Sequence, residues 1–369
     1  MKKLVLGILV LSVILSACSK DTQKKEDQNS TEDKIIEISN AQNSYGIYYK
    51  TNLDSGLTRI DYFDFESQSS QPLCTKSNCL HKDESCPAIE LTTYKDGTLI
   101  SMGSNDKNIY YIFTADIIKE NKDTGMKDYA PSLFLAKSDL DGSNLSIVYQ
   151  APEDRVYQGY AYIYEDHLFY PFSGMKYLDD QKKISINSSA IQLACVDLVS
   201  KEEDVFSNKD KQDLAYTSVY GFIDNKVYYS ELKQEEKIGV NPVAVKTYDF
   251  KTKETGTPYE ECLITNSRII NNKIYGYDGI RNQYISFDLK TGKQVGLKEG
   301  PVLKGNTNIF SVDGIINIST SADITSPAEL YTYDAIEGKE LDSSFYSSRR
   351  VDQGYLIFGK DGYEITEIS

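Results

Sequence analysis

Two short stretches decide the fold: Asn271-Asn272-Lys273-Ile274-Tyr275 and Phe287-Asp288-Leu289-Lys290-Thr291-Gly292. The first is a polar turn pair followed by a strand-like run, and the second is a strand-like run that ends in Asp and a polar turn. Asn-Asn and Lys-Thr-Gly suit tight turns, whereas Tyr, Phe and Ile suit a pleated, half-buried surface. Each stretch therefore predicts part of a β-hairpin.

Both patterns recur along the chain. Seven copies of the turn-and-strand pattern begin at Tyr45, Asp96, Glu165, Asp224, Asn271, Asp313 and Asp352. Six copies of the strand-and-turn pattern carry Asp64, Asp139, Asp197, Asp249, Asp288 and Asp334, which are 39 to 75 residues apart. Short antiparallel strands at such a period are typical of a β-propeller, and a β-sandwich would not repeat both patterns in one order.

The length of the repeating region sets the expected number of units. Residues 35–369 give about 48 residues for each of seven units, so the sequence predicts an all-β propeller of seven four-stranded blades, with six or eight as alternatives. The last unit stops after its third strand. Ile35-Ile36-Glu37-Ile38 could supply its missing strand or serve as the inner strand of unit one, and the sequence leaves both possibilities open.

Composition excludes several functions. The 369 residues carry a formal charge of −15, which repels phosphate backbones, so no nucleic-acid partner is expected. Hydrophobic residues make up 40% and charged residues 26%, which is ordinary globular composition and fits neither a disordered chain nor a multi-span membrane protein.

The N-terminus carries a targeting pattern. A basic start is followed by an apolar run over residues 4–15 and by Leu15-Ser16-Ala17-Cys18. The last four residues resemble the lipobox of bacterial lipoproteins. The resemblance implies that residues 1–17 are a cleaved signal peptide and that Cys18 carries acyl chains, such as palmitate, which hold the protein on the extracytoplasmic face of the cell membrane. A signal peptide with a chance Cys, or an uncleaved anchor, is the alternative.

A polar segment separates this pattern from the repeats. Residues 19–34 contain no apolar side chain, so residues 18–34 are predicted to be a disordered tether and residues 35–369 the propeller domain. The turns at residues 138–144 and 288–293 resemble those of the propeller lipoproteins of gut Firmicutes, a tandem-repeat kind without known function. This resemblance implies an architecture and no activity.

A Cys-rich segment passes from unit one to unit two. Its spacing, Cys-x4-Cys-x-His-x4-Cys, places Cys74, Cys79, His81 and Cys86 within 13 residues. Three thiolates and one imidazole are the ligands of a closed zinc site, and an extended chain would point Cys79 and His81 the same way. One structural zinc is therefore a candidate cofactor. A disulfide between two of the cysteines and free thiols are the alternatives.

Other candidate residues are weaker. Cys195 and Cys262 look like single core positions, and His167, in a Tyr-rich strand, looks like a packed side chain. The run from Asp139 begins like a calcium loop, but no Glu stands at its twelfth position, so a plain turn is favoured. No catalytic residue is identified.

Insertions indicate where function lies. They fall between strands two and three of units two, three and four, at about residues 103–131, 173–189 and 232–242. Strand alternation predicts that these insertions and the Cys/His segment share one face, and loops on a rigid scaffold usually carry function. The sequence thus predicts a module that binds a glycan, peptide or protein through this face. The alternative is an envelope enzyme: a glycan hydrolase or lyase, or a metal-dependent activity at the Cys/His site.

Overall fold

The computed structural model describes residues 35–39, 41–120, 127–152, 155–177, 184–186, 191–207, 217–232, 243–264, 266–351, 354–359 and 362–366. The predicted signal peptide, Cys18 and tether lie outside these ranges, as do residues 233–242 of the third insertion. In the described ranges, no helix combines the length and the apolar character needed to cross a membrane.

The described part of the chain is built from antiparallel sheets, which we number in chain order. The first sheet contains β2 (Ala41–Gln42), β3 (Gly46–Asn52), β4 (Thr58–Asp64) and β5 (Ser69–Pro72). The second contains β6 (Thr98–Ser104), β7 (Asn108–Glu120), β8 (Lys127–Asp139) and β9 (Ser146–Gln150). The third contains β1 (Ile35–Ile38), β10 (Arg155–Tyr157), β11 (Ala161–Tyr164), β12 (His167–Tyr177), β13 (Ile184–Ile186), β14 (Gln192–Asp197) and β15 (Glu203–Val205).

Four further sheets follow. The fourth contains β16 (Thr217–Ile223), β17 (Lys226–Leu232), β18 (Val243–Asp249) and β19 (Glu254–Cys262). The fifth contains β20 (Lys273–Asp278), β21 (Gln283–Asp288) and β22 (Lys293–Glu299). The sixth contains β23 (Asn306–Val312), β24 (Ile315–Ser321), β25 (Glu329–Asp334) and β26 (Lys339–Leu341), and the seventh β27 (Arg349–Val351), β28 (Gly354–Gly359) and β29 (Gly362–Thr366). Short helices are α2 (Pro87–Glu90) and the 3-10 turns η2 (Leu91–Asp96) and η3 (Ser343–Phe345).

The repeated aspartates close the hairpins between the last two strands of their sheets. Asp288 Oδ1 accepts hydrogen bonds from the backbone N–H groups of Lys290 and Thr291, both at 2.9 Å. Asp197, Asp249 and Asp334 do the same in their own turns, and Asp64 accepts from the backbone N–H of Ser67. An Asp side chain that bonds to the backbone two or three residues on mimics a backbone turn, so this position is selected for turn geometry.

The Asp139 turn follows the same chemistry. Asp139 Oδ2 accepts from the Asn144 side chain at 2.7 Å, and Asp141 Oδ1 accepts from the Ser143 backbone N–H at 2.9 Å. Protein groups of the turn itself therefore engage both carboxylates, as expected for a plain turn and not for a calcium loop.

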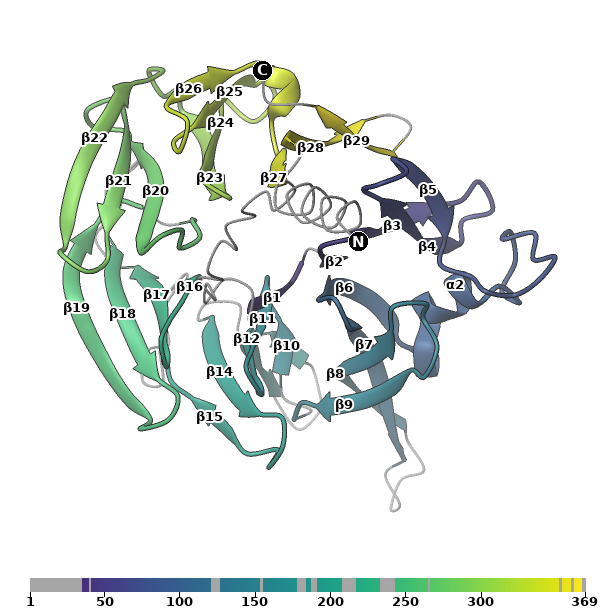
Figure 1. Cartoon of the computed structure of the whole chain (residues 1–369). Helices are drawn as coiled ribbons and strands as arrows, with labels where there is room; N and C mark the ends of the chain where they lie inside the picture. Colours follow the sequence, from purple (N-terminus) through teal and green to yellow (C-terminus); the bar gives the residue numbers. More distant parts are fainter. Residues whose placement is uncertain are drawn as a thin grey trace, which may run out of the picture. The chain divides into compact units, whose positions relative to one another are not determined.

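Neighbouring sheets pack face to face around a common centre, which makes the fold propeller-like (Figure 1). Tyr162 of the third sheet, for example, shares a buried cluster with Phe222 of the fourth. Val351 and Leu356 of the seventh sheet share another with Ile47 and Phe63 of the first. The last sheet is thus packed against the first.

The seventh sheet meets the sixth through polar groups instead. Asp334, which is fully buried, accepts hydrogen bonds from the Arg350 guanidinium and, at 2.5 Å, from the Tyr355 hydroxyl. A buried carboxylate stabilises such a joint only when partners satisfy it, and here two donors do so.

The first strand corrects the sequence-based expectation. β1 pairs with β11, with Ile35 opposite Tyr164 and Ile38 opposite Ala161. It belongs neither to the seventh sheet, which has three strands in the described residues, nor to the first, where β2 is innermost. Ile36 and Ile38 enter a buried cluster shared by the second and third sheets, which explains why the strand pairs there.

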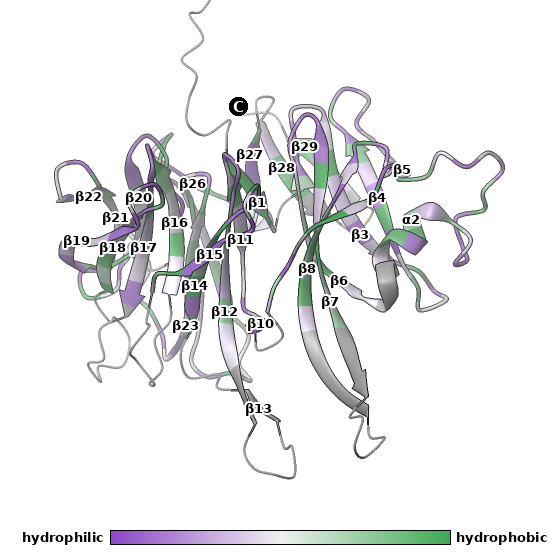
Figure 2. Cartoon of the chain, turned by 90° about the horizontal axis from the view of Figure 1, so that it is seen from below, coloured by the Kyte–Doolittle hydropathy of each residue, from purple (hydrophilic) through white to green (hydrophobic). Residues whose placement is uncertain are grey.

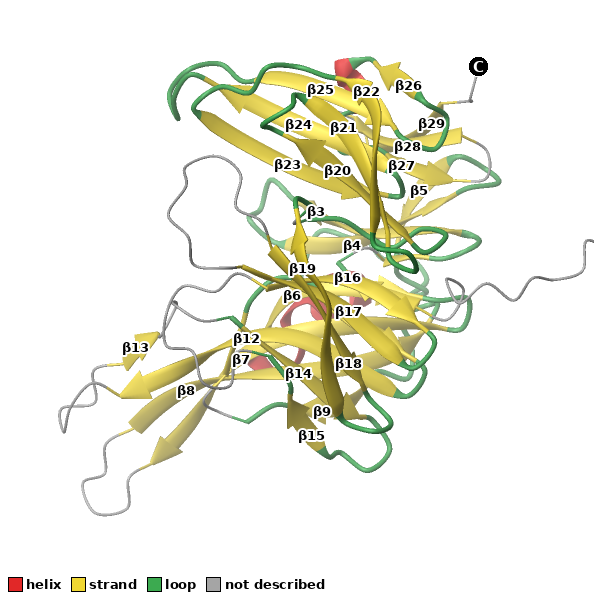
Figure 3. Ribbon diagram, turned by 90° about the vertical axis from the view of Figure 1, so that its left-hand side faces the viewer, coloured by secondary structure: helices red, strands yellow, loops and turns green. Residues whose placement is uncertain are grey.

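Two insertions project from one side of the molecule. The β7–β8 hairpin and the end of β12 with β13 extend in the same direction in two views (Figures 2 and 3). Ile35 pairs with Tyr164, directly before the β11–β12 turn, whereas β13 pairs with the other end of β12. The chain therefore enters the third sheet at the end opposite to the projecting hairpins.

Candidate metal centre

The Cys/His segment is anchored at both ends to the core beneath it. After β5, the backbone N–H of Leu73 donates to Ile60 O at 2.9 Å, and Leu73 is buried. At the other end Cys86 begins helix α2, whose Ala88 and Ile89 are buried in the same cluster as Leu73. Two fixed ends restrict the segment, so its ligand side chains can be held in one arrangement.

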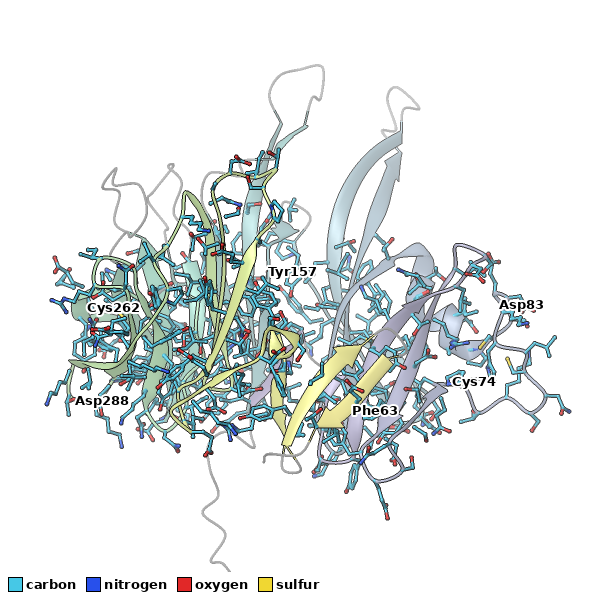
Figure 4. The ribbon with its side chains drawn as sticks, turned by 90° about the horizontal axis from the view of Figure 1, so that it is seen from above. Phe63, Cys74, Asp83, Tyr157, Cys262 and Asp288 are labelled. Carbon is cyan, nitrogen blue, oxygen red and sulfur yellow. The ribbon has the colours of Figure 1, made fainter. Side chains whose placement is uncertain are left out.

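The segment lies at the outer edge of the molecule. Cys74 and Asp83 are far out beside the first sheet, away from the projecting hairpins (Figure 4). The predicted single face that carries both the insertions and this segment is therefore wrong. The chain leaves the first sheet at its outer strand, β5, and the second sheet begins near the centre with β6. The connection between them, which contains the Cys/His segment and α2, therefore starts at the rim.

The four predicted ligands converge. One donor atom from each of Cys74, Cys79, His81 and Cys86 lies within 4.8 Å of the others. The Cys86 Sγ to His81 Nδ1 distance is 3.5 Å. Zn–S bonds of about 2.3 Å and Zn–N bonds of about 2.0 Å in a tetrahedron separate sulfur from nitrogen by about 3.5 Å. The donor set therefore fits zinc in type and number, and the Cys86–His81 distance matches tetrahedral coordination.

Turns, and not an extended strand, bring the ligands together. Asn78 and His81 have φ values of 57° and 56°, and the Cys79 backbone N–H donates to Lys76 O at 3.3 Å. The expectation that Cys79 and His81 align on an extended chain is thus wrong, although their convergence is confirmed. Residues in the left-handed conformation, which Asn tolerates better than most residues, reverse the chain sharply. These reversals fold Cys79 and His81 back toward Cys86.

Burial and hydrogen bonding act on two of the thiols in opposite directions. Burial raises the pKa of the Cys86 thiol to about 11, whereas a hydrogen bond from the His81 backbone lowers the pKa of Cys79. A thiolate in a buried position needs a positive partner, and a coordinated metal ion deprotonates thiol ligands outright.

A second layer of contacts orients the segment. Arg59 donates to His81 O at 3.4 Å, and the same guanidinium binds Asp61 through two bonds of 2.6 and 2.8 Å. Lys76 Nζ donates to Ser85 O at 3.0 Å. Such outer partners fix the backbone that carries the ligands, which metal sites usually require.

The remaining cysteines and histidine lie elsewhere. Cys195 and Cys262 are buried in separate core clusters, as predicted, and all five described cysteines are free thiols. His167 packs on the Phe250 ring, with centroids 4.7 Å apart. Within the described ranges, Cys74, Cys79, His81 and Cys86 are the only group of His, Cys, Asp or Glu placed to hold a metal.

Sequence reasoning missed a second polar cluster, near the centre of the molecule. Arg268 binds both carboxylate oxygens of Glu37, at 3.1 and 3.2 Å, and Arg349 lies 4.0 Å from Asp313. Glu37 and Arg268 are 231 positions apart, so no local spacing could reveal the pair.

Comparisons with known proteins find only low structural similarity. Neither protein-family models nor curated proteins match the sequence. Among solved structures, an oligogalacturonate lyase from Vibrio parahaemolyticus has 12% identity and a TM-score of 0.49, with 88% of each chain covered. An acylaminoacyl peptidase from Pyrococcus horikoshii has 13% identity and a TM-score of 0.43, covering 86% of this chain and 49% of that one. An apocarotenoid oxygenase from Synechocystis has 10% identity and a TM-score of 0.42, covering 82% and 70%.

Similarities this low transfer no activity to the chain. Fold and site together define a propeller-like protein whose rim carries a Cys3His group that could hold a metal ion.

Proposed function

We propose that the chain is a lipid-anchored, extracytoplasmic, seven-bladed propeller that acts as a binding module, with one structural zinc ion clamping its rim. The observation that carries the proposal is the complete set of four protein donors at the rim. Four protein ligands fill a tetrahedral zinc site, as in structural centres, whereas catalytic centres keep one position for water or substrate.

Seven blades are supported by the sheets and their packing. The described strands form seven sheets, and Val351 of the last is buried with Phe63 of the first. Among the described residues the seventh blade has three strands, and this packing, in place of a shared strand, would close the ring.

The zinc ion would stabilise the step from blade one to blade two. Cys74 lies two residues after β5, and Cys86 is the N-cap of α2, whose residues pack under both blades. Coordination joins the two ends of this connection, so metal binding contributes directly to the stability of the folded state.

The anchor would leave the projecting hairpins facing outward. Cys18 would carry the lipid, and β1 enters the domain at the end of the third sheet opposite to β13. Hairpins β7–β8 and β12–β13 would then extend away from the membrane, where a glycan, peptide or partner protein reaches them.

An enzyme remains the second candidate, as a glycan hydrolase or lyase or as a metal-dependent activity at the rim. The contacts of the described residues favour it less. Of the two histidines of the chain, His81 lies against the Cys86 thiol, and His167 packs on Phe250 with its Nδ1 buried and without a hydrogen-bond partner among the described residues. Glu37, a half-buried carboxylate, is held by Arg268 and is poorly placed to exchange protons.

Two experiments on the full-length protein test the proposal. Mass analysis of protein extracted from membranes should find an acylated N-terminal Cys18, and Cys18→Ser should remain unprocessed and unacylated. A thermal-shift screen of the extracted protein against envelope and host glycans should find a ligand that raises the melting temperature without being consumed. Turnover of a glycan would replace the binding module with the enzyme.

A further inference from the structure

The first strand runs inside the ring of sheets. β1 pairs with β11 along its whole length and lies close to the centre of the molecule (Figure 1). A Cβ added to Gly103 of β6 would lie 2.7 Å from Glu37 O and 3.0 Å from Ile38 Cα. β1 is thus wedged between the inner strands of the second and third sheets, with backbone approaching backbone.

The two faces of β1 have opposite chemistry. Ile36 and Ile38 are 7% and 0% exposed in the cluster between the second and third sheets. Glu37, between them, points the other way because alternate residues of a strand face opposite sides. Its carboxylate meets Arg268, which follows the fourth sheet and precedes β20.

Arg268 is held on every side. Its Nε and one terminal nitrogen donate to Glu37 at 3.1 and 3.2 Å, and the other terminal nitrogen donates to Val219 O and Ser267 O, both at 3.2 Å. The rings of Tyr160 and Tyr162 lie 5.4 and 5.2 Å from the guanidinium carbon. This is a bidentate carboxylate receptor with aromatic walls.

We propose that β1 is a latch strand, locked in the centre of the ring by Glu37 in the Arg268 receptor. Strand β1 then ties the second and third sheets, which it contacts directly, to the fourth and fifth, which hold Arg268. The latch opens and closes as a unit, and an open latch leaves Arg268 able to take a small carboxylate from solution. This inference depends on neither the lipid anchor nor the ligand proposed above.

Hydrogen exchange on the full chain tests the latch. Glu37→Gln keeps the shape of the side chain and removes its charge, so amides in residues 35–38 and 161–164 should exchange at least about tenfold faster, while amides of the sixth sheet stay unchanged. Glu340→Gln is the matched control, because its partner Lys298 lies 3.0 Å away in an exposed pair. This variant should leave both segments unchanged.

Chemical rescue tests the receptor. In Glu37→Ala, acetate should slow exchange of residues 35–38 and 161–164 in a saturable way, whereas chloride at equal ionic strength should not. Arg268→Lys should open the latch and abolish the rescue, since Lys lacks the planar fork. Uniform acceleration across all sheets, an effect no larger than that of Glu340→Gln, or equal action of acetate and chloride would each overturn the proposal.

Discussion

The rim group of Cys74, Cys79, His81 and Cys86 and the central pair of Glu37 and Arg268 are assembled in opposite ways. At the rim, four donors from 13 consecutive residues gather around a position that could hold a metal ion. In the centre, Glu37 and Arg268 come from opposite parts of the chain and satisfy each other without any ion. A local motif depends on an external partner, whereas a contact between distant residues depends on the completed fold. The predictions below separate these two dependences.

The largest effect is expected at the rim. Cys86→Ser should release the zinc and lower the free energy of unfolding by several kcal/mol, because the metal's binding energy contributes to folding. Cys195→Ser is the matched control: Cys195 is equally a buried free thiol, so this variant should keep its zinc. Urea unfolding of both variants, with and without a chelator, measures the difference. A chelator that leaves the wild-type midpoint unchanged would contradict this role.

Acid should disrupt the rim group and the Glu37–Arg268 pair at different pH values. Although burial alone would raise the pKa of Glu37, the positive charges of Arg268 and Arg349 lower it from 4.5 to about 2. Protonation is therefore harder in the folded state, so the pair's contribution is complete above about pH 4.5 and is lost as pH falls toward 2. At about 1.36 kcal/mol per pH unit, it amounts to about 3 kcal/mol.

Comparison of the wild type with Glu37→Gln isolates the contribution of the Glu37–Arg268 pair to the free energy of unfolding. The difference in unfolding free energy between wild type and variant should shrink as pH falls from 4.5 to 2. Zinc should leave at higher pH than this, because protons compete for its thiolate ligands. One acid titration, monitored by hydrogen exchange and by metal content, measures the order of the two losses. Opening of the latch at a higher pH than the release of zinc would contradict this prediction.

A smaller effect is expected where β1 touches β6. Gly103→Ala places a methyl group against the backbone of Glu37 and Ile38, and overpacking of this kind costs about 1–3 kcal/mol. Gly174→Ala is the control, since nothing lies within 4 Å of its added Cβ. Thermal unfolding should show a lower midpoint for Gly103→Ala only. Equal midpoints would mean that β1 is not wedged as described.

The smallest effect is expected beside the metal ligands. Leu80, between Cys79 and His81, is 76% exposed, so Leu80→Ser should change stability by no more than about 0.5 kcal/mol and leave zinc content intact. Metal analysis and thermal unfolding check this. A large loss of either would show that Leu80 packs on the centre, contrary to its exposure.

Prediction from sequence succeeded where the determining residues are neighbours. The all-β class and the turn role of Asp288 follow from local patterns, and the convergence of Cys79, His81 and Cys86 follows from spacing. The turns that create this convergence could not be predicted from the sequence, because the spacing of the ligands does not indicate that His81 adopts a left-handed backbone conformation.

Prediction failed where distant residues decide. The place of β1 depends on an open edge at β11 and on Arg268, more than 200 positions away, and its own four residues fit any half-buried strand. The rim position of the Cys/His segment likewise depends on how far outward β5 lies. Strand alternation describes only which end of a blade a loop leaves.

Metal analysis of the full-length protein, purified under non-oxidising conditions without added metal, tests the central claim most directly. The account predicts one zinc per chain, none in His81→Ala, and a cobalt-substituted form with the intense visible bands of tetrahedral thiolate coordination. Folded protein without zinc, with a disulfide between two of Cys74, Cys79 and Cys86, would contradict it.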